Sequence, residues 1–224
     1  MININDLSFS YTNKSEPLLK DINIKIPNGI YLSILGENGS CKSTLVKLIL
    51  GLLKPNSGSI NLDFNKISYV PQRLDNFNAQ FPITVREILS THAKIMGIRD
   101  FNEIKNSLNK VNMDDFENNL IGNLSGGQQQ RIFIARALIG DPDLIILDEP
   151  STGVDEKSQN EIYPLLKNLN KNFGKTIISV EHNTKIALKY SSHILKIHNG
   201  ILNLYTKDDF IKHLKSEQQN SFAI

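Results

Sequence analysis

The stretch that decides the fold is residues 36–44, which read GENGSCKST. It follows a short apolar run at residues 30–35 and precedes residues 45–52, in which Leu and Ile recur with helical spacing. A strand, a glycine-rich turn and a helix in this order form a loop whose backbone N–H groups converge on a phosphate. The sequence therefore predicts a phosphate-binding loop and a helix that begins near Cys41 or Lys42.

Each position of this loop has an expected role toward a nucleotide. Lys42 would reach the terminal phosphates, and Ser43 would place its hydroxyl on a magnesium ion. Glycine allows backbone angles that bring successive N–H groups together. The other expected nucleotide-binding positions of the loop are Gly36, Asn38, Gly39, Ser40, Cys41 and Thr44.

Cys41 stands where the pattern G-x-x-x-x-G-K-[ST] has its second glycine. Because this residue lies at the entry of the helix, we expect a negative φ there, which tolerates a Cβ. A lysine and a helix N-terminus beside the thiol favour its thiolate form. We therefore expect a weakened but working loop, in which the single cysteine is either reactive or buried and inert.

Residues 143–149 (DLIILDE) form a continuous apolar run that ends in two acids, as in a parallel strand buried on both faces. Ligands bind at the carboxyl ends of such strands. Adjacent residues of a strand point in opposite directions, so Asp148 and Glu149 are expected to have different tasks. Asp148 would hold magnesium, mostly through water, and Glu149 would act as general base on the attacking water. The plain alternative is two acids that end a strand.

Residues 124–128 (LSGGQ) open a long predicted helix, for which Ser125 alone would be a good N-cap. The three motifs in this order resemble the nucleotide-binding subunit of an ABC transporter, and the resemblance covers residues 2–205. It implies an α/β fold: a P-loop NTPase with a RecA-like core, an N-terminal antiparallel β-subdomain and an inserted helical subdomain. It also implies nucleotide contacts from Ser125, Gly126, Gly127 and Gln128.

The resemblance assigns further positions by motif. Tyr11 matches the aromatic residue that stacks on adenine, and Gln72 matches the glutamine that contacts magnesium and the attacking water. Asp155 matches a loop that crosses the dimer interface, and it can cap the following helix at the same time. His182 matches the switch histidine, although the residues on both sides of it depart from the usual pattern. Taken alone, these four would be ordinary strand, turn, cap and surface residues.

In this family the LSGGQ helix of one subunit faces the phosphate loop of the other. The resemblance therefore implies a head-to-tail dimer with a second copy of this chain, which encloses two ATP molecules with Mg²⁺. Ser125, Gly126 and Gly127 would direct N–H groups, a hydroxyl and a helix dipole at the γ-phosphate held by the second copy. ATP binding would close this dimer, and hydrolysis would open it.

The 224 residues suffice for one large domain or for two lobes that share a core. We expect a single ABC ATPase domain, with an ATP-binding core at approximately residues 1–83 and 141–206. A helical lobe at approximately residues 84–140, hinged at Gln72, would form a groove for a short helix of a membrane permease. Residues 207–224 would form a C-terminal tail.

Further elements follow from the apolar spacing. Strands are expected near residues 175–180, 193–197 and 201–205, with helices between them that start near Asp155 and Thr184. Pro164 falls inside the first of these helices, where we expect a kink or a break.

Composition limits the partners and the location. The 25 Lys and Arg residues nearly balance the 23 Asp and Glu residues, so we expect no nucleic-acid partner. One cysteine favours a reducing compartment, and no run approaches the roughly 18 apolar residues that cross a bilayer. We expect a peripheral protein on the cytoplasmic face of the membrane, bound to a permease and linked indirectly to an extracytoplasmic metal-binding protein.

Residues 76–85 (NFNAQFPITV) bear on the cargo. They resemble the zinc and manganese branch of ABC importers, in which a Phe-Pro-x-Thr-Val element follows the glutamine matched by Gln72. Small residues at the position of Cys41 also occur in that branch. The resemblance places zinc first, manganese next, and iron chelates and cobalamin behind them. Packing of Phe81 and Val85 inside the helical lobe would explain part of the same pattern.

Two other classes of protein remain as alternatives. A GTPase or a kinase with a phosphate loop needs no LSGGQ helix. A soluble ABC ATPase that acts in translation or DNA repair usually carries two cassettes or a long coiled coil, and this sequence has neither. Co-purification with an integral membrane subunit would separate a transporter from such a protein.

Overall fold

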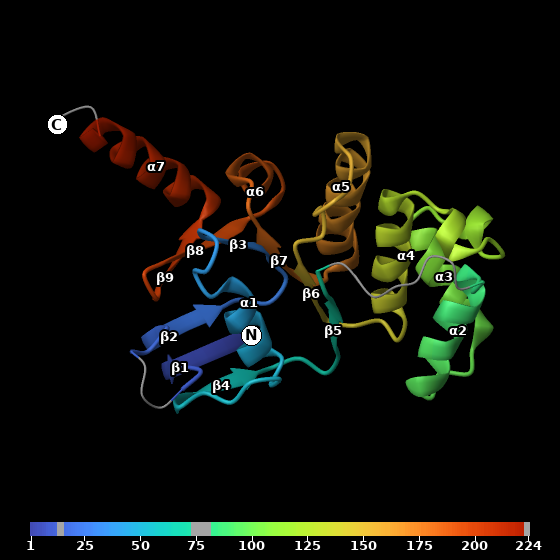
Figure 1. Ribbon diagram of the computed structural model, residues 1–224, viewed down its shortest axis with the longest axis horizontal. Helices are drawn as coiled ribbons and strands as arrows, with labels where there is room; N and C mark the ends of the chain where they lie inside the picture. Colours follow the sequence, from blue (N-terminus) through green and yellow to red (C-terminus); the bar gives the residue numbers. More distant parts are fainter. Residues whose placement is uncertain (13–15, 73–81, 222–224) are drawn as a thin grey trace. The chain divides into compact units, whose positions relative to one another are not determined.

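The computed structural model describes residues 1–12, 16–72 and 82–221, and Figure 1 shows its helices and strands. The chain divides into two compact units, Met1–Asp63 with Ile178–Ile224, and Phe64–Ile177. The first unit contains the phosphate loop, and the second contains the acid pair and the LSGGQ segment. Residues 76–81, which carry part of the resemblance to metal importers, lie outside the described residues.

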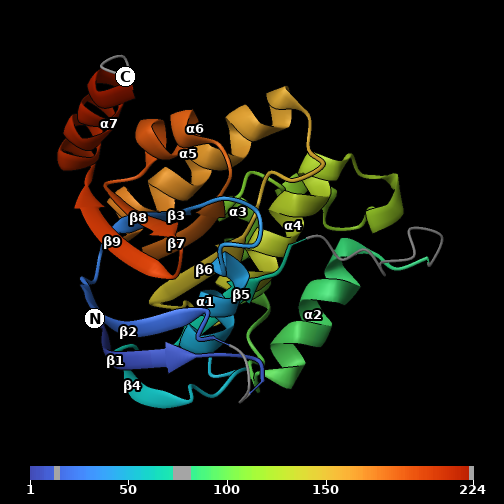
Figure 2. The same cartoon turned by 60° about the vertical axis from the view of Figure 1, so that its left-hand side comes forward.

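The first unit opens with an antiparallel sheet in the order β2-β1-β4, seen side by side in Figure 2. Ile2 and Ile4 of β1 lie opposite Ile26 and Ile24 of β2, so alternate residues bury one face of the sheet. This confirms the predicted N-terminal antiparallel subdomain. The bounds are β1 Ile2–Phe9, β2 Leu19–Ile26 and β4 Ser57–Leu62.

A second, mainly parallel set of strands follows in the order β7-β3-β8-β9. Leu32 pairs with His193 where β3 and β8 run parallel, and β9 returns antiparallel to β8. Every residue of β3 and β7 is buried, as in central parallel strands. The bounds are β3 Tyr31–Leu35, β7 Thr176–Glu181, β8 His193–His198 and β9 Ile201–Thr206, close to the predicted ranges.

Three helices complete the first unit: α1 Lys42–Ile49, α6 Thr184–Tyr190 and α7 Lys207–Ser221. The predicted apolar stripe of α1 is buried. The region expected as a C-terminal tail contains α7, whose Phe210 is 2% exposed. Phe210 belongs to a buried cluster with Leu35, Ala187 and Ile194, so the start of α7 is anchored to the strands of this unit.

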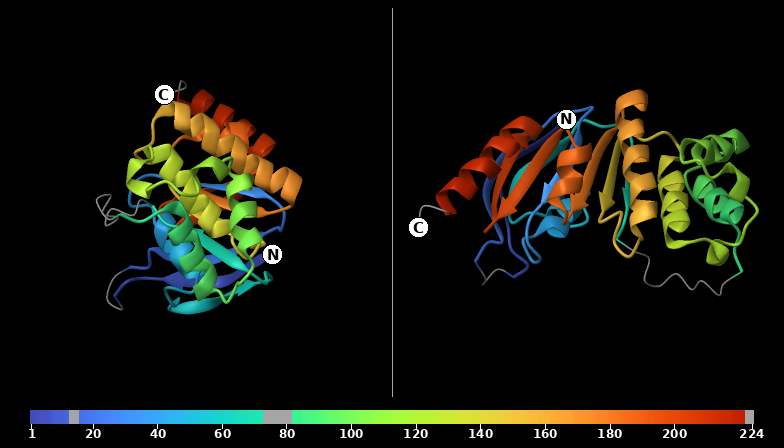
Figure 3. Two further views of the ribbon diagram at one scale, coloured as in Figure 1. Left: turned by 90° about the vertical axis from the view of Figure 1, so that its right-hand side faces the viewer. Right: turned by 90° about the horizontal axis from the view of Figure 1, so that it is seen from above.

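The second unit combines two parallel strands with helices. Ile67 of β5 pairs with Leu144 of β6, and Val70 pairs with Leu147. The helices of residues 84–140, green in Figure 3, have the 3.6-residue period that the sequence predicts. The bounds are β5 Ile67–Val70, β6 Leu144–Asp148, α2 Val85–Ile95, α3 Phe101–Lys110, the short Asp114–Phe116 and Ile121–Asn123, and α4 Gly126–Leu138.

Helix α5, Glu156–Phe173, continues through Pro164. The helix is therefore not broken at this proline, and the kink that was the other expectation stays a prediction. Ile162, Tyr163 and Leu166 are buried on both sides of the proline. Burial of this apolar face stabilises the helix more than one lost backbone hydrogen bond weakens it.

Candidate nucleotide-binding and catalytic site

The phosphate loop lies between β3 and α1 in the first unit and turns tightly on itself. The Ser40 N–H donates to the Glu37 carbonyl over 3.1 Å. A Cβ on Gly36 would lie 2.3 Å from Ser40 Oγ and 2.7 Å from the Ile197 carbonyl oxygen, so only glycine fits there. Gly39 has φ of +82°, a conformation that glycine adopts without strain. Close approach and backbone angle thus explain the two glycines.

Lys42 is 6% exposed and holds its ammonium over the loop. Its Nζ donates to the carbonyls of Gly36 and Glu37, each over 2.8 Å. These contacts fix the charge beside the turn that we expect to bind the terminal phosphates. These two acceptors are neutral carbonyls, so they hold the ammonium in place without neutralising its charge.

Cys41 differs from our expectation in two ways. Its φ is +72°, not negative, so an L-residue occupies the left-handed conformation that the pattern reserves for glycine. Burial raises the pKa of its thiol, and the nearby Lys42 opposes this shift only in part. The expected preference for thiolate is therefore wrong. The thiol donates weakly to the Gly39 carbonyl, with Sγ and O 3.7 Å apart.

Tyr11 stands at the edge of the same unit, with 59% of its surface exposed. Its ring meets Phe9 edge to face at a centroid distance of 5.1 Å, and its hydroxyl lies 3.0 Å from Thr44 Oγ1. The hydroxyl contact ties the tyrosine to the first turn of α1. The exposed ring leaves a face for a flat base, and its expected stacking on adenine stays a prediction.

A pocket of about 300 Å³ adjoins the outer part of the loop and is lined by residues 37–41, Pro17, Leu18 and residues 197–200. Asn38 and Gly39 are exposed at the loop tip, and Ser43 is half-buried. Ser40 Oγ is buried and has no hydrogen-bond partner among the described residues. A buried hydroxyl of this kind suits a ligand that supplies the missing acceptor.

His182 is exposed and follows the last residue of β7. The two neighbours that depart from the family pattern have structural roles. Asn183 caps α6 by accepting from the Lys185 N–H at 2.9 Å. Glu181, which is 3% exposed, accepts a short hydrogen bond from the Ser179 hydroxyl. The Asn183 cap fixes the chain after the histidine, and the Ser179 contact holds the side chain of the residue before it.

In the second unit, β6 delivers Asp148 at its carboxyl end. The carboxylate is 5% exposed and lies 3.4 Å from the Tyr69 hydroxyl, which donates to it. Burial and the negative charge of Asp148 raise the pKa of Tyr69 to about 12. Tyr69 therefore stays protonated and can act as a donor at any physiological pH. Sequence reasoning did not single out this tyrosine.

Glu149 lies outside the strand and has φ of +50°. Asp148 and Glu149 contact different partners, and the chain leaves the extended conformation at Glu149, so the strand pleat on which we based their different tasks does not continue through Glu149. Glu149 Oε2 accepts from Gln72 Nε2 at 2.5 Å and from Thr152 Oγ1 at 2.8 Å. The structure thus brings Gln72 and Glu149 together as the motifs suggest, and it adds Thr152, which the sequence analysis missed.

The LSGGQ segment forms the start of α4 through a capping box. Ser125 Oγ accepts from the Gln128 N–H at 3.3 Å, and Gln128 Oε1 accepts from the Ser125 N–H at 2.9 Å. The purely structural role of Ser125 as an N-cap is thereby confirmed. The Gln128 side chain is engaged within its own chain, so its expected contact with nucleotide stays a prediction.

The two glycines of this motif differ in what surrounds them. A Cβ on Gly127 would lie 2.2 Å from Cβ of Ser158 in α5, so the packing of α4 on α5 requires a glycine. A Cβ on Gly126 would meet nothing nearer than the Gly153 carbonyl oxygen at 3.8 Å among the described residues. Gly126 is therefore not required by the chain itself, which fits a position that a ligand or partner approaches closely.

Asp155 caps α5. It accepts from the Ser158 N–H at 2.9 Å and from the Ser158 hydroxyl at 2.8 Å, and these bonds lower the pKa of its carboxyl. The capping role is confirmed, and the role at a dimer interface stays a prediction. Ser158 thus contacts both Asp155 and the position of Gly127, a link between two motifs that sequence reasoning missed.

These features define a class of protein. ATP-binding cassettes typically combine three features. A phosphate loop follows one buried parallel strand, an acid pair ends another, and a helix that begins with a serine cap and two glycines lies between them in sequence. The ABC transporter family model matches residues 19–152, and the chain belongs to this family.

Similar proteins agree with this assignment. A "Probable metal transport system ATP-binding protein" of Treponema pallidum is 40% identical over 96% of this chain and 90% of its own length. The "Zinc uptake system ATP-binding protein ZurA" of Listeria monocytogenes is 38% identical over 90% of this chain and 84% of its own. The dimeric structure of MJ0796, a "Bacterial ABC Transporter Cassette", matches with a TM-score of 0.75 and 29% identity, over 92% of this chain and 99% of that one.

Proposed function

We propose that this chain is the ATP-hydrolysing subunit of an ABC importer for a divalent transition metal, zinc ahead of manganese. The observation that carries the ATPase assignment is the pairing of Gln72 and Glu149 beside buried Asp148, in a chain that also has the phosphate loop. Similarity to ATP-binding proteins of metal and zinc uptake supports the cargo. The permease and an extracytoplasmic metal-binding protein would be separate chains.

Residues of the first unit bind ATP. The exposed ring of Tyr11 stacks on adenine, and the turn formed by residues 36–41 wraps the phosphates with its N–H groups. Lys42 presents its ammonium to the terminal phosphates. The Ser40 hydroxyl, without a partner in the described chain, gains an acceptor from the ligand.

The donors assigned to Mg²⁺ are the Ser43 hydroxyl, the Gln72 amide oxygen and the Asp148 carboxylate. All are hard oxygen ligands of the type that Mg²⁺ prefers. Asp148 is 5% exposed, and a buried carboxylate is stabilised by a nearby cation, so this carboxylate suits a bound Mg²⁺. When bound, Mg²⁺ neutralises charge on the β- and γ-phosphates.

Hydrolysis requires an activated water. Glu149 takes the proton of the water that attacks the γ-phosphate, and Gln72, which donates a hydrogen bond to Glu149, orients that water. His182, which lies between the end of β7 and the Asn183 cap of α6, contacts the γ-phosphate. The products are ADP and inorganic phosphate.

A second copy of the chain completes each site. Ser125 is held by its capping box, and a Cβ on Gly126 would make no contact closer than 3.8 Å among the described residues, so the start of α4 can approach a phosphate bound by the other subunit. MJ0796, a dimeric cassette, is similar over 92% of this chain, which supports this arrangement.

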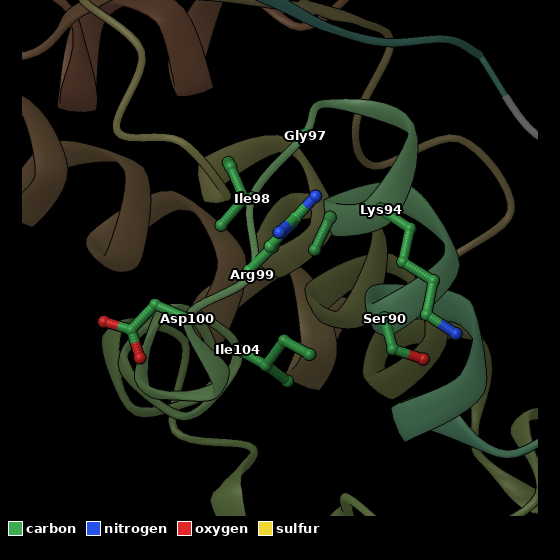
Figure 4. Close-up of a pocket in the computed structure, with 8 residues that line it drawn as sticks. Ser90, Lys94, Gly97, Ile98, Arg99, Asp100 and Ile104 are labelled. Carbon is green, nitrogen blue, oxygen red and sulfur yellow. The ribbon is translucent and has the colours of Figure 1, made fainter.

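The permease docks on the helical part of the second unit. Figure 4 shows a pocket of about 380 Å³ between the end of α2 and the start of α3. Ala93 and Ile104 give it buried apolar lining, and the two bases Lys94 and Arg99 outnumber the one acid of the lining, Asp100. This groove suits a short amphipathic helix that carries an acidic residue.

No helix in the described parts of the chain is both long and apolar enough to cross a membrane. We place the subunit on the cytoplasmic face of the membrane, held there by its permease, because ATP is supplied on that side.

Growth of a strain that lacks this chain tests the proposal. We expect a defect under metal limitation that added zinc corrects and added manganese does not. The parent gene should restore growth, whereas Glu149→Gln should not. Rescue by manganese alone would reverse the order of the two metals, and indifference to both would contradict metal import.

A further inference from the structure

The carboxylate of Glu149 is held on one oxygen by two donors from different parts of the chain. Gln72 Nε2 and Thr152 Oγ1 both donate to Oε2, at 2.5 Å and 2.8 Å. Thr152 also donates its backbone N–H to the Glu149 carbonyl at 3.1 Å, which closes a turn around the glutamate. Side chain and backbone of Thr152 therefore both fix Glu149.

This turn is itself anchored to α5. The Tyr163 hydroxyl donates to Ser151 Oγ at 2.8 Å, and the ring of Tyr163 is 1% exposed. The Val154 N–H donates to the Ser151 carbonyl at 3.2 Å, and Gln159 Nε2 donates to the Val154 carbonyl at 3.0 Å. Hydrogen bonds from α5 therefore hold the turn that carries Thr152.

A glutamate carboxylate needs such support. Rotation of the carboxylate group about its last side-chain bond is nearly unrestricted, since sp³–sp² torsions have broad minima. Hydrogen bonds must therefore set the direction in which its oxygens point. Gln72 is expected to engage the attacking water during the reaction, so it cannot hold the carboxylate throughout.

We propose that Thr152 is a positioning residue for ATP hydrolysis, whose hydroxyl keeps the Glu149 carboxylate turned toward the attacking water. This inference rests on the proposed role of Glu149 as general base. The proton passes from water to Glu149, and the Thr152 hydroxyl donates to the same carboxylate before and during the transfer. Thr152 itself neither gains nor loses a proton.

Two substitutions at Thr152 separate the effect of its hydroxyl from the effect of its side-chain size. Thr152→Val keeps the size of the side chain and removes the donor, and we expect kcat to fall about tenfold with KM for ATP unchanged. Thr152→Ser keeps the donor and should recover most of this loss. Because Thr152 is exposed, both variants should melt at the parent temperature. Thr91→Val, at an exposed position of α2, is the matched control and should leave kcat unchanged.

Glu149→Gln separates this inference from the proposed function on which it rests. It should lower turnover by about two orders of magnitude, the scale of a lost general base, and adding Thr152→Val should lower it no further. If Glu149→Gln is inactive while Thr152→Val keeps parental kcat, the role of Thr152 is wrong and that of Glu149 stands. If Glu149→Gln keeps parental activity, the catalytic assignment itself is wrong.

Discussion

Helices α1 and α4 both begin after glycine-containing motifs, yet their N-termini are closed in different ways. Before α1, Cys41 has φ of +72° and makes no side-chain hydrogen bond to the helix end. Before α4, Ser125 is extended, with φ of −61°, and exchanges two hydrogen bonds with Gln128. The first start depends on a left-handed backbone, and the second depends on a side-chain cap.

This difference shows which of the two helix starts is stabilised entirely by residues of its own chain. Ser125 satisfies helix donors locally, so α4 keeps its start without any ligand. The phosphate loop instead uses positive φ at Gly39 and Cys41 to form a concave turn, a geometry suited to an anion. We infer that the loop is shaped for its nucleotide, whereas the start of α4 is a preformed surface offered to another subunit.

Both helix starts share one electrostatic feature. Among the described helices of eight or more residues, α1 and α4 are those without an acidic residue in the first turn, and α2, α3, α5 and α7 each carry one or two. An acid there would offset the positive end of the helix dipole. Its absence at these two helices fits a role toward phosphate.

The largest expected effect separates binding from turnover. Lys42→Ala removes the cation over the loop and should weaken ATP binding by the isolated chain about 100-fold or more. Ser125→Arg places a bulky side chain at the start of α4 and should leave that binding within about twofold while it abolishes hydrolysis. Titration with a fluorescent ATP analogue, beside a phosphate-release assay, measures both. Equal loss of ATP binding in the two variants would contradict the different roles assigned to the phosphate loop and to the start of α4.

A second effect concerns the two glycines of α4. Gly127→Ala should destabilise the chain by about 1–3 kcal/mol, because its Cβ collides with Ser158. Gly126→Ala, whose Cβ would make only an ordinary van der Waals contact with the Gly153 carbonyl oxygen, should change the free energy of unfolding by less than about 0.5 kcal/mol. Denaturant unfolding measures both values.

Ser158→Gly is the matched partner in this test. It removes the Cβ that a new alanine would strike, so Gly127→Ala should cost less in that background than in the parent. An equal cost in both backgrounds would mean that Ser158 is not the reason for the glycine.

A smaller effect is expected at Cys41. The left-handed backbone strains an L-residue by about 1–2 kcal/mol, and glycine removes this strain at a cost of up to about 1 kcal/mol in chain entropy. Cys41→Gly should therefore be more stable than Cys41→Ala by about 1 kcal/mol and should change ATP affinity less than about fivefold. A large gain in affinity would mean that the cysteine cripples the loop.

The smallest effect is one of thiol reactivity. Because burial raises the pKa of Cys41, its thiol is protonated at neutral pH and becomes thiolate only as the pH rises above the ordinary range of a cysteine. Alkylation by iodoacetamide at pH 7 should be slower than that of a model thiol and should accelerate with pH. ATP should protect it. Fast alkylation at pH 7 would contradict the raised pKa.

The positions of both helix starts could be predicted from the sequence, because the phosphate loop and the LSGGQ segment are local patterns. The capping box could have been predicted too, since Ser125 and Gln128 have its S-x-x-Q spacing. The φ of Cys41 could not, because helix entry and anion-binding turn favour opposite backbone angles at that residue. Its thiol pKa depends on burial, which is a tertiary property.

The other differences depend on tertiary structure or on backbone angles that the sequence pattern does not reveal. Ser158 lies 31 positions beyond Gly127, so no local pattern shows why that glycine is needed. Pro164 is tolerated because the buried face of α5 outweighs its local preference. The Thr152 contact has a short spacing, three residues from Glu149, but it requires the positive φ of Glu149, which the strand pattern hides.

The measurement that tests the central claim most directly is complementation between two inactive variants. If each site combines the phosphate loop of one chain with the LSGGQ helix of another, a mixture of Lys42→Ala and Ser125→Arg chains contains dimers with one intact site. Random pairing should restore about a quarter of parental ATPase activity. A chain with both substitutions, mixed with parent, forms mixed dimers that have no intact site, so it should not add activity. No activity from the first mixture would contradict the account.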